Sequence, residues 1–182
     1  TNPRTNGIQA IKINDGDQLL AVKLTKGDNH VVIAVRSGRA IHFHERDVRA
    51  MGRVAAGVRG ITLGNKEDRV VGMVTVYKPE IDLLVVAEKG VGKRSAVADY
   101  RITKRGGKGV KTLNITNKTG ALAAIEAVTD GDELLIINTS GIAIRISVDS
   151  LRVMGRNTQG VRLIRLNEGD AITSIAKITE NL

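Results

Sequence analysis

Cations and glycines concentrate in one short segment, residues 103–109, whose sequence is Thr-Lys-Arg-Gly-Gly-Lys-Gly. Lysine and arginine can neutralise phosphate groups, and glycines allow a backbone to approach a ligand closely. The same glycines could equally do no more than shape a tight turn. Related basic stretches, Pro-Arg-Thr-Asn, Met-Gly-Arg-Val-Ala-Ala and Met-Gly-Arg-Asn-Thr-Gln, precede Gly7, Gly57 and Gly160. Side chains of this kind suit contact with a polyanion better than catalysis.

The other reactive side chains form no convincing site. His42 and His44 flank Phe43 on a predicted strand, so both rings face one side, as a pair of metal ligands would. The chain has no cysteine, and no convincing set of carboxylates completes the pair, so exposed polar strand residues are the simpler interpretation. No Walker motif for ATP is present. We therefore expect no catalytic residue, no metal and no cofactor in this chain.

The charge balance points to an anionic partner. The 182 residues include 28 Lys and Arg against 19 Asp and Glu, a formal net charge of +9. A positive excess of this size favours nucleic acid. With no Trp and only Phe43, Tyr77 and Tyr100, the chain lacks the aromatic platforms that stack single-stranded bases. No recognition helix or zinc finger is visible either. The sequence therefore favours sequence-independent contact with duplex phosphates.

Membrane attachment is not expected. No apolar run approaches the roughly 18 residues of a membrane-spanning helix, and no signal sequence is visible. We expect a cytoplasmic protein with no membrane partner.

The basic stretches mark an internal repeat. Each precedes a Gly-Val or Gly-Ile step, at Gly7, Gly57, Gly109 and Gly160, and these glycines are separated by 50, 52 and 51 residues. A period of this length is typical of propeller blades or solenoid turns. We divide a single domain, residues 1–182, into repeats 7–56, 57–108 and 109–159 and a half-repeat 160–182.

Short runs rich in Val and Ile predict about four β-strands in each repeat. Acidic turns beginning at Asp15, Lys66 and Glu168 precede one strand of their repeats, and glycine turns beginning at Ser37, Lys89 and Ser140 mark hairpins. The predicted strands include residues 19–24, 31–35, 70–76, 83–87, 134–138 and 143–148. The expected class is an all-β, propeller-like pinwheel of four-stranded repeats.

The chain also resembles a known family, the C-terminal domain that DNA gyrase A shares with its relative, the A subunit of topoisomerase IV. The resemblance spans nearly the whole chain, and the segments that carry it are residues 48–53, 67–76, 90–100 and 152–166. It implies a six-bladed β-pinwheel that wraps double-stranded DNA around a basic perimeter during negative supercoiling.

The family's signature heptapeptide, Gln-[Arg/Lys]-Arg-Gly-Gly-[Arg/Lys]-Gly, is matched at six of seven positions by residues 103–109, with Thr103 in place of Gln. In the family this box belongs to the first blade, whereas here the match ends the second full repeat and leads into the third. We interpret it as a box-like loop, and expect the true box upstream of Thr1 and the present repeats to be later blades of the disc.

The resemblance implies several further expectations. The chain would bind and bend or wrap duplex DNA, and its partners would be the rest of gyrase A together with gyrase B in an A2B2, ATP-dependent DNA topoisomerase (an isomerase). The catalytic tyrosine and the ATPase would lie outside this chain, in an enzyme associated with the bacterial nucleoid. The expected DNA-binding residues are Arg4, Arg39, Arg49, Arg53, Arg59, Lys93, Arg94, Lys104, Arg105, Lys108, Lys111, Arg145, Arg152, Arg156 and Arg162. The box-like loop comprises Thr103, Lys104, Arg105, Gly106, Gly107, Lys108 and Gly109.

Two alternatives stay open at this stage. The first is the topoisomerase IV form of the domain, which presents DNA for decatenation. The second is a protein-interaction propeller of the kelch type that binds an acidic protein, although kelch blades carry aromatics that are almost absent here.

Overall fold

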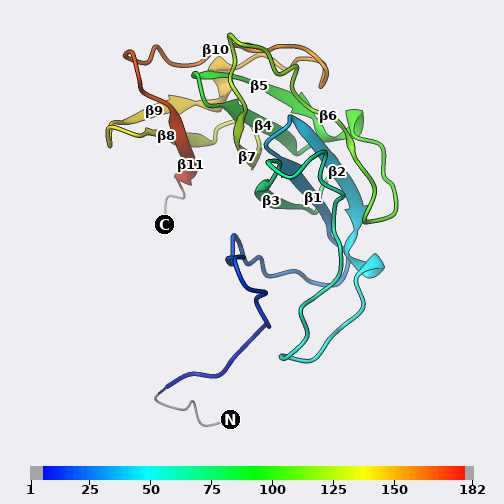
Figure 1. Cartoon of the computed structure of the whole chain (residues 1–182). Helices are drawn as coiled ribbons and strands as arrows, with labels where there is room; N and C mark the ends of the chain where they lie inside the picture. The colour runs from blue at the N-terminus through cyan, green and yellow to red at the C-terminus, as the bar shows by residue number, and fades with distance from the viewer. Residues whose placement is uncertain (1–5, 179–182) are drawn as a thin grey trace.

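Three antiparallel β-sheets follow one another around an arc (Figure 1) in the computed structural model, which describes residues 6–178. Their strand orders are β3-β1-β2-β6, β10-β5-β4-β7 and β11-β8-β9. The described residues contain no α-helix, only three single-turn 3-10 helices. None of the helices in this part of the chain is long and apolar enough to cross a membrane. The predicted all-β, propeller-like pinwheel is confirmed.

The elements are short and regularly spaced. The strands are β1 (His30–Val35), β2 (Arg39–His44), β3 (Val70–Val76), β4 (Asp82–Ala87), β5 (Val91–Ala96), β6 (Val110–Lys111), β7 (Leu122–Val128), β8 (Glu133–Asn138), β9 (Ala143–Ser147), β10 (Val161–Arg162) and β11 (Ile172–Ile178). The 3-10 turns are η1 (Glu45–Asp47), η2 (Val97–Asp99) and η3 (Val148–Ser150).

Each sheet is built on one tight hairpin. The hairpins β1–β2, β4–β5 and β8–β9 reverse at Gly38, Gly90 and Gly141, with φ of 78°, 75° and 78°. This left-handed conformation is costly for residues with a Cβ, which explains why a glycine occupies the turn in all three hairpins. The hairpins predicted from the glycine turns are confirmed.

Strand pairing then links one repeat to the next. The strand β3 pairs with β1, β7 with β4, and β11 with β8, so the third strand of every sheet comes from the repeat after its hairpin. The fourth strands of the first two sheets, β6 and β10, come from one repeat further on. A sheet therefore draws on as many as three of the sequence repeats, and the repeats are interlocked.

The core lies between neighbouring sheets. On β4, Leu83 and Val85 face a cluster shared with the first sheet, whereas Leu84 and Val86 face a cluster shared with the third. All four are fully buried, which explains why this strand is a continuous apolar run rather than an alternating one.

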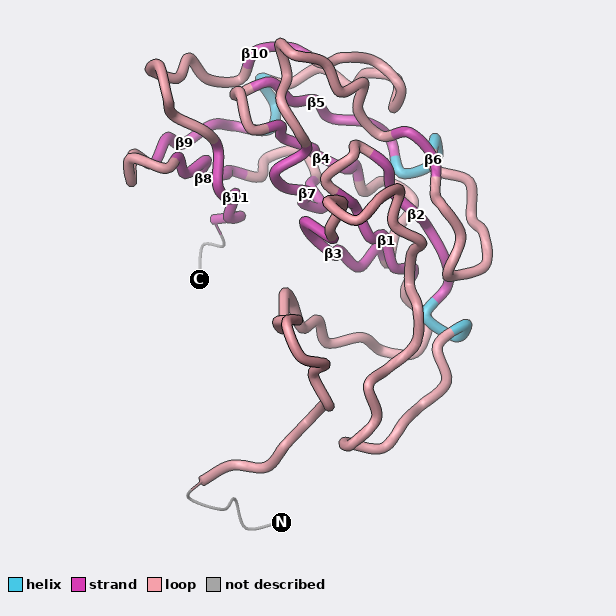
Figure 2. Tube along the Cα trace, in the orientation of Figure 1, coloured by secondary structure: helices cyan, strands magenta, loops and turns pink. Residues whose placement is uncertain are grey.

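The predicted strand at residues 19–24 does not form. Residues 6–29 are irregular (Figure 2), and Leu20 and Leu24 are 49% and 97% exposed. The equivalent strands β3, β7 and β11 each pair with the hairpin of the preceding repeat. Because the described residues contain no hairpin before residue 19, this segment has no pairing partner, and local propensity alone does not order a strand.

One turn recurs in every repeat, and in the second to fourth repeats it lies between the incoming strand and the hairpin before it. The turn closes with a backbone bond from residue 17 to 14, 68 to 65, 119 to 116 and 170 to 167, a period of 51 residues. At Asp68 the carboxylate accepts hydrogen bonds from Ser37 N (2.9 Å), Ser37 Oγ (2.7 Å) and Gly64 N (3.0 Å). This carboxylate therefore holds the turn before β3 against the β1–β2 hairpin.

We expect Asp68→Asn to lower the free energy of unfolding by about 1–3 kcal/mol at neutral pH, because an amide nitrogen would replace an oxygen that accepts hydrogen bonds from Ser37 and Gly64. Burial alone would raise the pKa of Asp68, but the hydrogen bonds from Gly64 and Ser37 outweigh it, and the pKa lies below the ordinary 3.8. The contribution of the ionised Asp68 carboxylate to the free energy of unfolding is therefore complete above about pH 4. It is lost as pH falls through the folded-state pKa. Denaturant titrations between pH 2 and 7 measure this.

The matched control is Asp17→Asn. Asp17 occupies the same turn position in the first repeat, is exposed, and its carboxylate has no hydrogen bond within the described residues. Its replacement should change stability by no more than about 0.5 kcal/mol. Equal effects at both positions would refute the role assigned to Asp68.

Candidate nucleic-acid interface

Two equivalent loops run along the second hairpin strand of the first two sheets, β2 and β5. After η2, the backbone of Thr103 donates to His42 O on β2 (2.8 Å), and the chain then runs along β2 into β6. After η3, Met154 donates in the same way to Arg94 O on β5 (2.8 Å), and the chain runs into β10. We call residues 103–109 the first rim loop and residues 154–160 the second rim loop.

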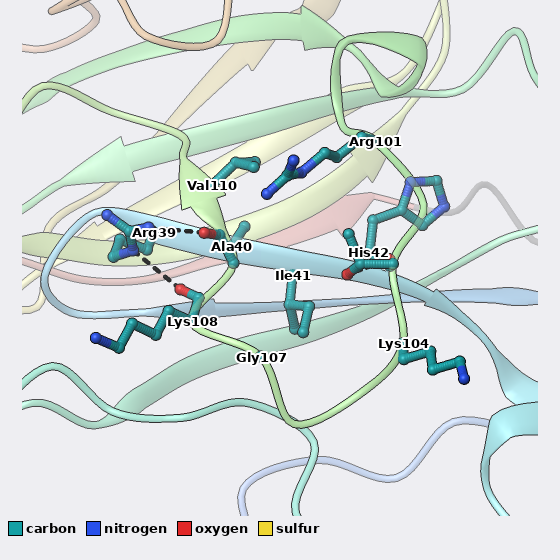
Figure 3. A pocket seen from close by; sticks show the side chains of 11 residues that line it. Arg39, Ala40, Ile41, His42, Arg101, Lys104, Gly107, Lys108 and Val110 are labelled. Carbon is teal, nitrogen blue, oxygen red and sulfur yellow. Dashed lines mark hydrogen bonds between the residues drawn. The ribbon is translucent and has the colours of Figure 1, made fainter.

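The first rim loop encloses a cationic pocket of about 330 Å³ (Figure 3). Its charged lining residues are Arg39, Arg101, Lys104 and Lys108, and no carboxylate lines it. Arg39 reaches across from β2 and donates to Lys108 O (2.9 Å) and Gly109 O (2.7 Å). Because the pocket combines positive charge with no internal counter-ion, it can accept an anionic group such as a phosphate.

The glycines of this loop serve different purposes. Gly109 has φ of 67°, and a Cβ there would lie 2.4 Å from Ala40 O, so this glycine is required by packing against β2. Gly106 also has a positive φ of 83°. Gly107 lacks a positive φ, and the nearest atom to an added Cβ would be Ile41 Cδ1 at 3.5 Å. Turn shape thus explains Gly106 and Gly109, whereas Gly107 is an exposed position with room beside its backbone.

Each rim loop is fixed by one arginine. Arg105 donates from Nε to Asp47 O (3.0 Å) and from Nη1 to Arg59 O (3.0 Å). Arg156 repeats the arrangement with Asp99 O (2.9 Å) and Lys111 O (2.8 Å). Neither Nη2 has a hydrogen-bond partner among residues 6–178. Each guanidinium therefore joins segments of consecutive repeats and keeps one nitrogen, Nη2, without a partner in the described residues.

The outer cations form three periodic sets. Members of the first set lie two residues after the end of each 3-10 turn. Members of the second set lie in the basic stretches before Gly57, Gly109 and Gly160, and members of the third lie two residues after these glycines. The sets are Arg49, Arg101 and Arg152; Arg53, Arg105 and Arg156; and Arg59, Lys111 and Arg162. All nine are exposed or half-buried. Arg101 is the member that our sequence prediction missed, although aligning the repeats on η1, η2 and η3 would have found it.

Two expected DNA contacts are instead buried. Arg94, 7% exposed, donates to Asp82 Oδ2 (2.6 Å) and Asp130 Oδ1 (2.6 Å). Lys93, 1% exposed, lies beneath the second rim loop, and burial together with repulsion from Arg156 lowers its pKa to about 8. Because both charges are engaged inside the protein, neither residue is available to a phosphate, and we no longer assign them as DNA contacts.

Two further expected DNA contacts, Arg145 and Arg4, belong to none of the three periodic sets. Arg145 is exposed and pairs with Glu133 across the β8–β9 hairpin. Arg4 lies outside the described residues.

The three histidines pack against one another. His30 lies across the sheet from His44, and its ring centroid is 4.9 Å from those of both His42 and His44. His42 Nδ1 lies 2.7 Å from Tyr100 O, and burial lowers the pKa of His42. Among residues 6–178 no group of three or more His, Cys, Asp or Glu side chains is placed to hold a metal ion.

Comparison with known proteins assigns the chain to a family. The family model described as "DNA gyrase C-terminal domain, beta-propeller" matches residues 1–26, 29–76, 82–129 and 132–179. The chain belongs to the DNA gyrase A C-terminal domain family. This gyrase A domain family is the one that the sequence motifs predicted, so the prediction is confirmed.

The sequence relatives agree with this assignment. The DNA gyrase A subunit of Chlamydia pneumoniae is 43% identical over 182 residues, which cover 100% of this chain and 22% of the relative. The DNA gyrase A subunit of Ureaplasma parvum is 47% identical over 173 residues, which cover 95% of this chain and 20% of the relative. The chain thus spans about a fifth of the length of these relatives.

Solved structures share the gyrase A domain's fold. A DNA gyrase A C-terminal domain superposes with a TM-score of 0.86 at 28% identity. The superposed region covers 96% of this chain and 59% of the solved chain. The C-terminal domain of a DNA topoisomerase IV superposes with a TM-score of 0.88 at 22% identity, covering 94% and 53%, and shows the shared fold alone.

Proposed function

We propose that this domain binds double-stranded DNA along its outer rim with little sequence preference. The observation that supports this most directly is the triple periodicity of the exposed or half-buried cations, which recurs in three successive repeats. Loops of a repeat protein that gather on one side form a continuous surface. A duplex is a rod with one negative charge about every 1.7 Å, and a track of regularly spaced cations is complementary to it.

The chemistry of the rim concerns phosphates rather than bases. Contacts come from arginine and lysine side chains and from backbone amides, which position a duplex without reading its sequence. Tyr77 is the one exposed residue among the Phe, Tyr and Trp of residues 6–178, so single-stranded bases could not stack on a series of aromatic platforms here.

The curved path of the rim implies DNA bending. The two rim loops belong to consecutive sheets of the arc, so we expect a duplex bound along both to bend with the arc (Figure 1). Bending 20–30 base pairs by 40–90° costs on the order of 1–6 kcal/mol, which successive phosphate contacts must offset. Energy transfer between dyes at the two ends of a short duplex should therefore rise on binding.

In its wider setting, we propose that the chain serves a bacterial DNA gyrase, an ATP-dependent topoisomerase that supercoils DNA. Its partners would be the rest of gyrase A together with gyrase B, in the cytoplasm and associated with the nucleoid. We favour gyrase over topoisomerase IV because the sequence relatives at 42–47% identity are gyrase A subunits. The reaction itself is assigned to residues outside this chain.

We expect duplex binding to weaken steeply with salt, by roughly 0.9 in the slope of log K against log salt for each phosphate neutralised. Arg101→Ala should reduce that slope by about one such increment, because Arg101 lines the pocket and has no hydrogen bond within the described residues. Fluorescence anisotropy of a labelled duplex at several salt concentrations measures both effects.

The matched control is Lys66→Ala, which removes one exposed cation from the turn before β3, outside the three rim sets. It should leave the slope unchanged within error. A wild-type slope near zero would eliminate the proposed function, and equal slopes for the two variants would eliminate the assigned path.

A further inference from the structure

A buried lysine organises the second rim loop. Lys93 Nζ donates to Gly155 O (2.8 Å), Arg156 O and Thr158 O (3.1 Å), and lies 3.3 Å from Thr158 Oγ1. The side chain is 1% exposed, so a full ammonium group sits beneath the loop with carbonyl oxygens as its main ligands. The proposed function makes no use of this group.

The position of Lys93 is occupied by an apolar residue in the other two hairpins. Lys93 is the third residue after the hairpin glycine of β5, and the equivalent residues on β2 and β9 are Ile41 and Ile144. Burying a cation where an isoleucine fits is costly unless it is well hydrogen-bonded. The lysine therefore calls for an explanation beyond filling space.

The hydrogen bonds from Lys93 to these carbonyl groups also set the direction of the N–H groups in the second rim loop. In a planar trans peptide the C=O and the following N–H point in opposite directions. With the carbonyls of Gly155, Arg156 and Thr158 turned inward, the N–H groups of Arg156, Asn157 and Gln159 point outward. None of these three N–H groups has a hydrogen-bond partner among residues 6–178.

One bond is common to both rim loops, because Asn114 N donates to Thr158 O (3.1 Å) as Thr62 N donates to Gly107 O, but the other bonds that hold the first rim loop are different. There Thr62 donates from Oγ1 to Gly106 O (2.6 Å) and from N to Gly107 O (2.9 Å), while Arg39 binds Lys108 O and Gly109 O. Hence Gly107 and Lys108 also have N–H groups without a partner among the described residues. Two loops of different sequence share inward carbonyls and outward amides, which indicates a common use for the amides.

We propose that Lys93 is a positioning residue that holds the second rim loop with its backbone amides turned outward to bind DNA phosphates. This rests on the proposed DNA binding and deepens it: the amides of Arg156, Asn157 and Gln159, beside the free Nη2 of Arg156, form a phosphate-binding surface. Lys93 itself does not touch the DNA. Unpaired backbone N–H groups beside a cation are the standard elements of a phosphate site.

Hydrogen–deuterium exchange of the intact protein tests this, with and without a duplex of about 40 base pairs. In the wild type, DNA should slow exchange at residues 155–159 and at residues 104–108. In Lys93→Met, which keeps the chain length and removes the ammonium, DNA should protect residues 104–108 alone. Duplex affinity should fall about tenfold, equivalent to one or two hydrogen bonds.

The outcomes separate the two proposals. If the wild type binds no duplex, DNA binding itself fails. If it binds and Lys93→Met retains protection at residues 155–159, the role of Lys93 is wrong while DNA binding stands. Should Lys93→Met fail to fold, Lys93→Ile carries the same test, because isoleucine is accommodated at the equivalent Ile41 and Ile144.

Discussion

Replacing Arg94 by alanine should lower the free energy of unfolding by about 3–5 kcal/mol, the range found when one partner of a buried ion pair is removed. The side chains of Arg94 and Asp82 are 8% and 11% exposed, and their atoms Nε and Oδ2 lie 2.6 Å apart. Alanine would leave the carboxylate of Asp82 buried between β4 and β5 without a counter-ion. Chemical denaturation followed by circular dichroism measures the change.

The third sheet provides the control for this prediction. Arg145 and Glu133 make the corresponding pair across β8 and β9, but their side chains are 57% and 35% exposed. Arg145→Ala should therefore cost no more than about 1 kcal/mol. The double variant Arg94→Ala/Asp82→Ala should recover part of the loss, because no uncompensated charge remains. Equal losses for Arg94→Ala and Arg145→Ala would contradict the assignment of Arg94 to the core.

Gly109→Ala should lower the free energy of unfolding by about 2–5 kcal/mol, the sum of a left-handed backbone penalty of 1–2 and an overpacking penalty of 1–3 kcal/mol. The added Cβ would lie 2.4 Å from Ala40 O and 2.7 Å from Ala40 C, which are backbone atoms of β2 and cannot rotate away. The loop would have to separate from β2, and β6 with it. Thermal and chemical denaturation both report the loss.

Two glycines serve as controls. Gly131 has φ of 82° with nothing within 4 Å of an added Cβ, so Gly131→Ala should show the backbone penalty of about 1–2 kcal/mol alone. Gly107→Ala should leave stability nearly unchanged, because Gly107 lacks the positive φ and has room. If Gly109→Ala is no worse than Gly131→Ala, the contact with β2 does not constrain the loop.

The prediction from sequence was most successful where the signal was local. Hairpin turns at Gly38, Gly90 and Gly141 could be predicted because a positive φ requires glycine at that one position. The strands β3 and β11 could be predicted because Val and Ile runs follow acidic turns. The family followed from several motifs distributed over the whole chain.

The failures concern features that depend on distant residues. Residues 19–24 have the composition of a strand, but a strand needs a partner, and the described residues hold no hairpin at that place. Lys93 and Arg94 lie in a basic, glycine-containing stretch that resembles the rim loops. Lys93 is buried because residues 154–160, about 60 positions further along the chain, cover it, and Arg94 is buried beside Asp82 on β4.

By itself, the sequence determined the all-β class, the period of 51 residues, the hairpins and the net positive charge, because each depends on residue type and local spacing. Only the tertiary structure decided which repeats exchange strands and which cations are exposed. It also decided that Lys93 binds carbonyl groups instead of phosphate. These properties depend on pairings between residues tens of positions apart. The local sequence around Lys93 and Arg94 does not indicate which distant residues will bury them.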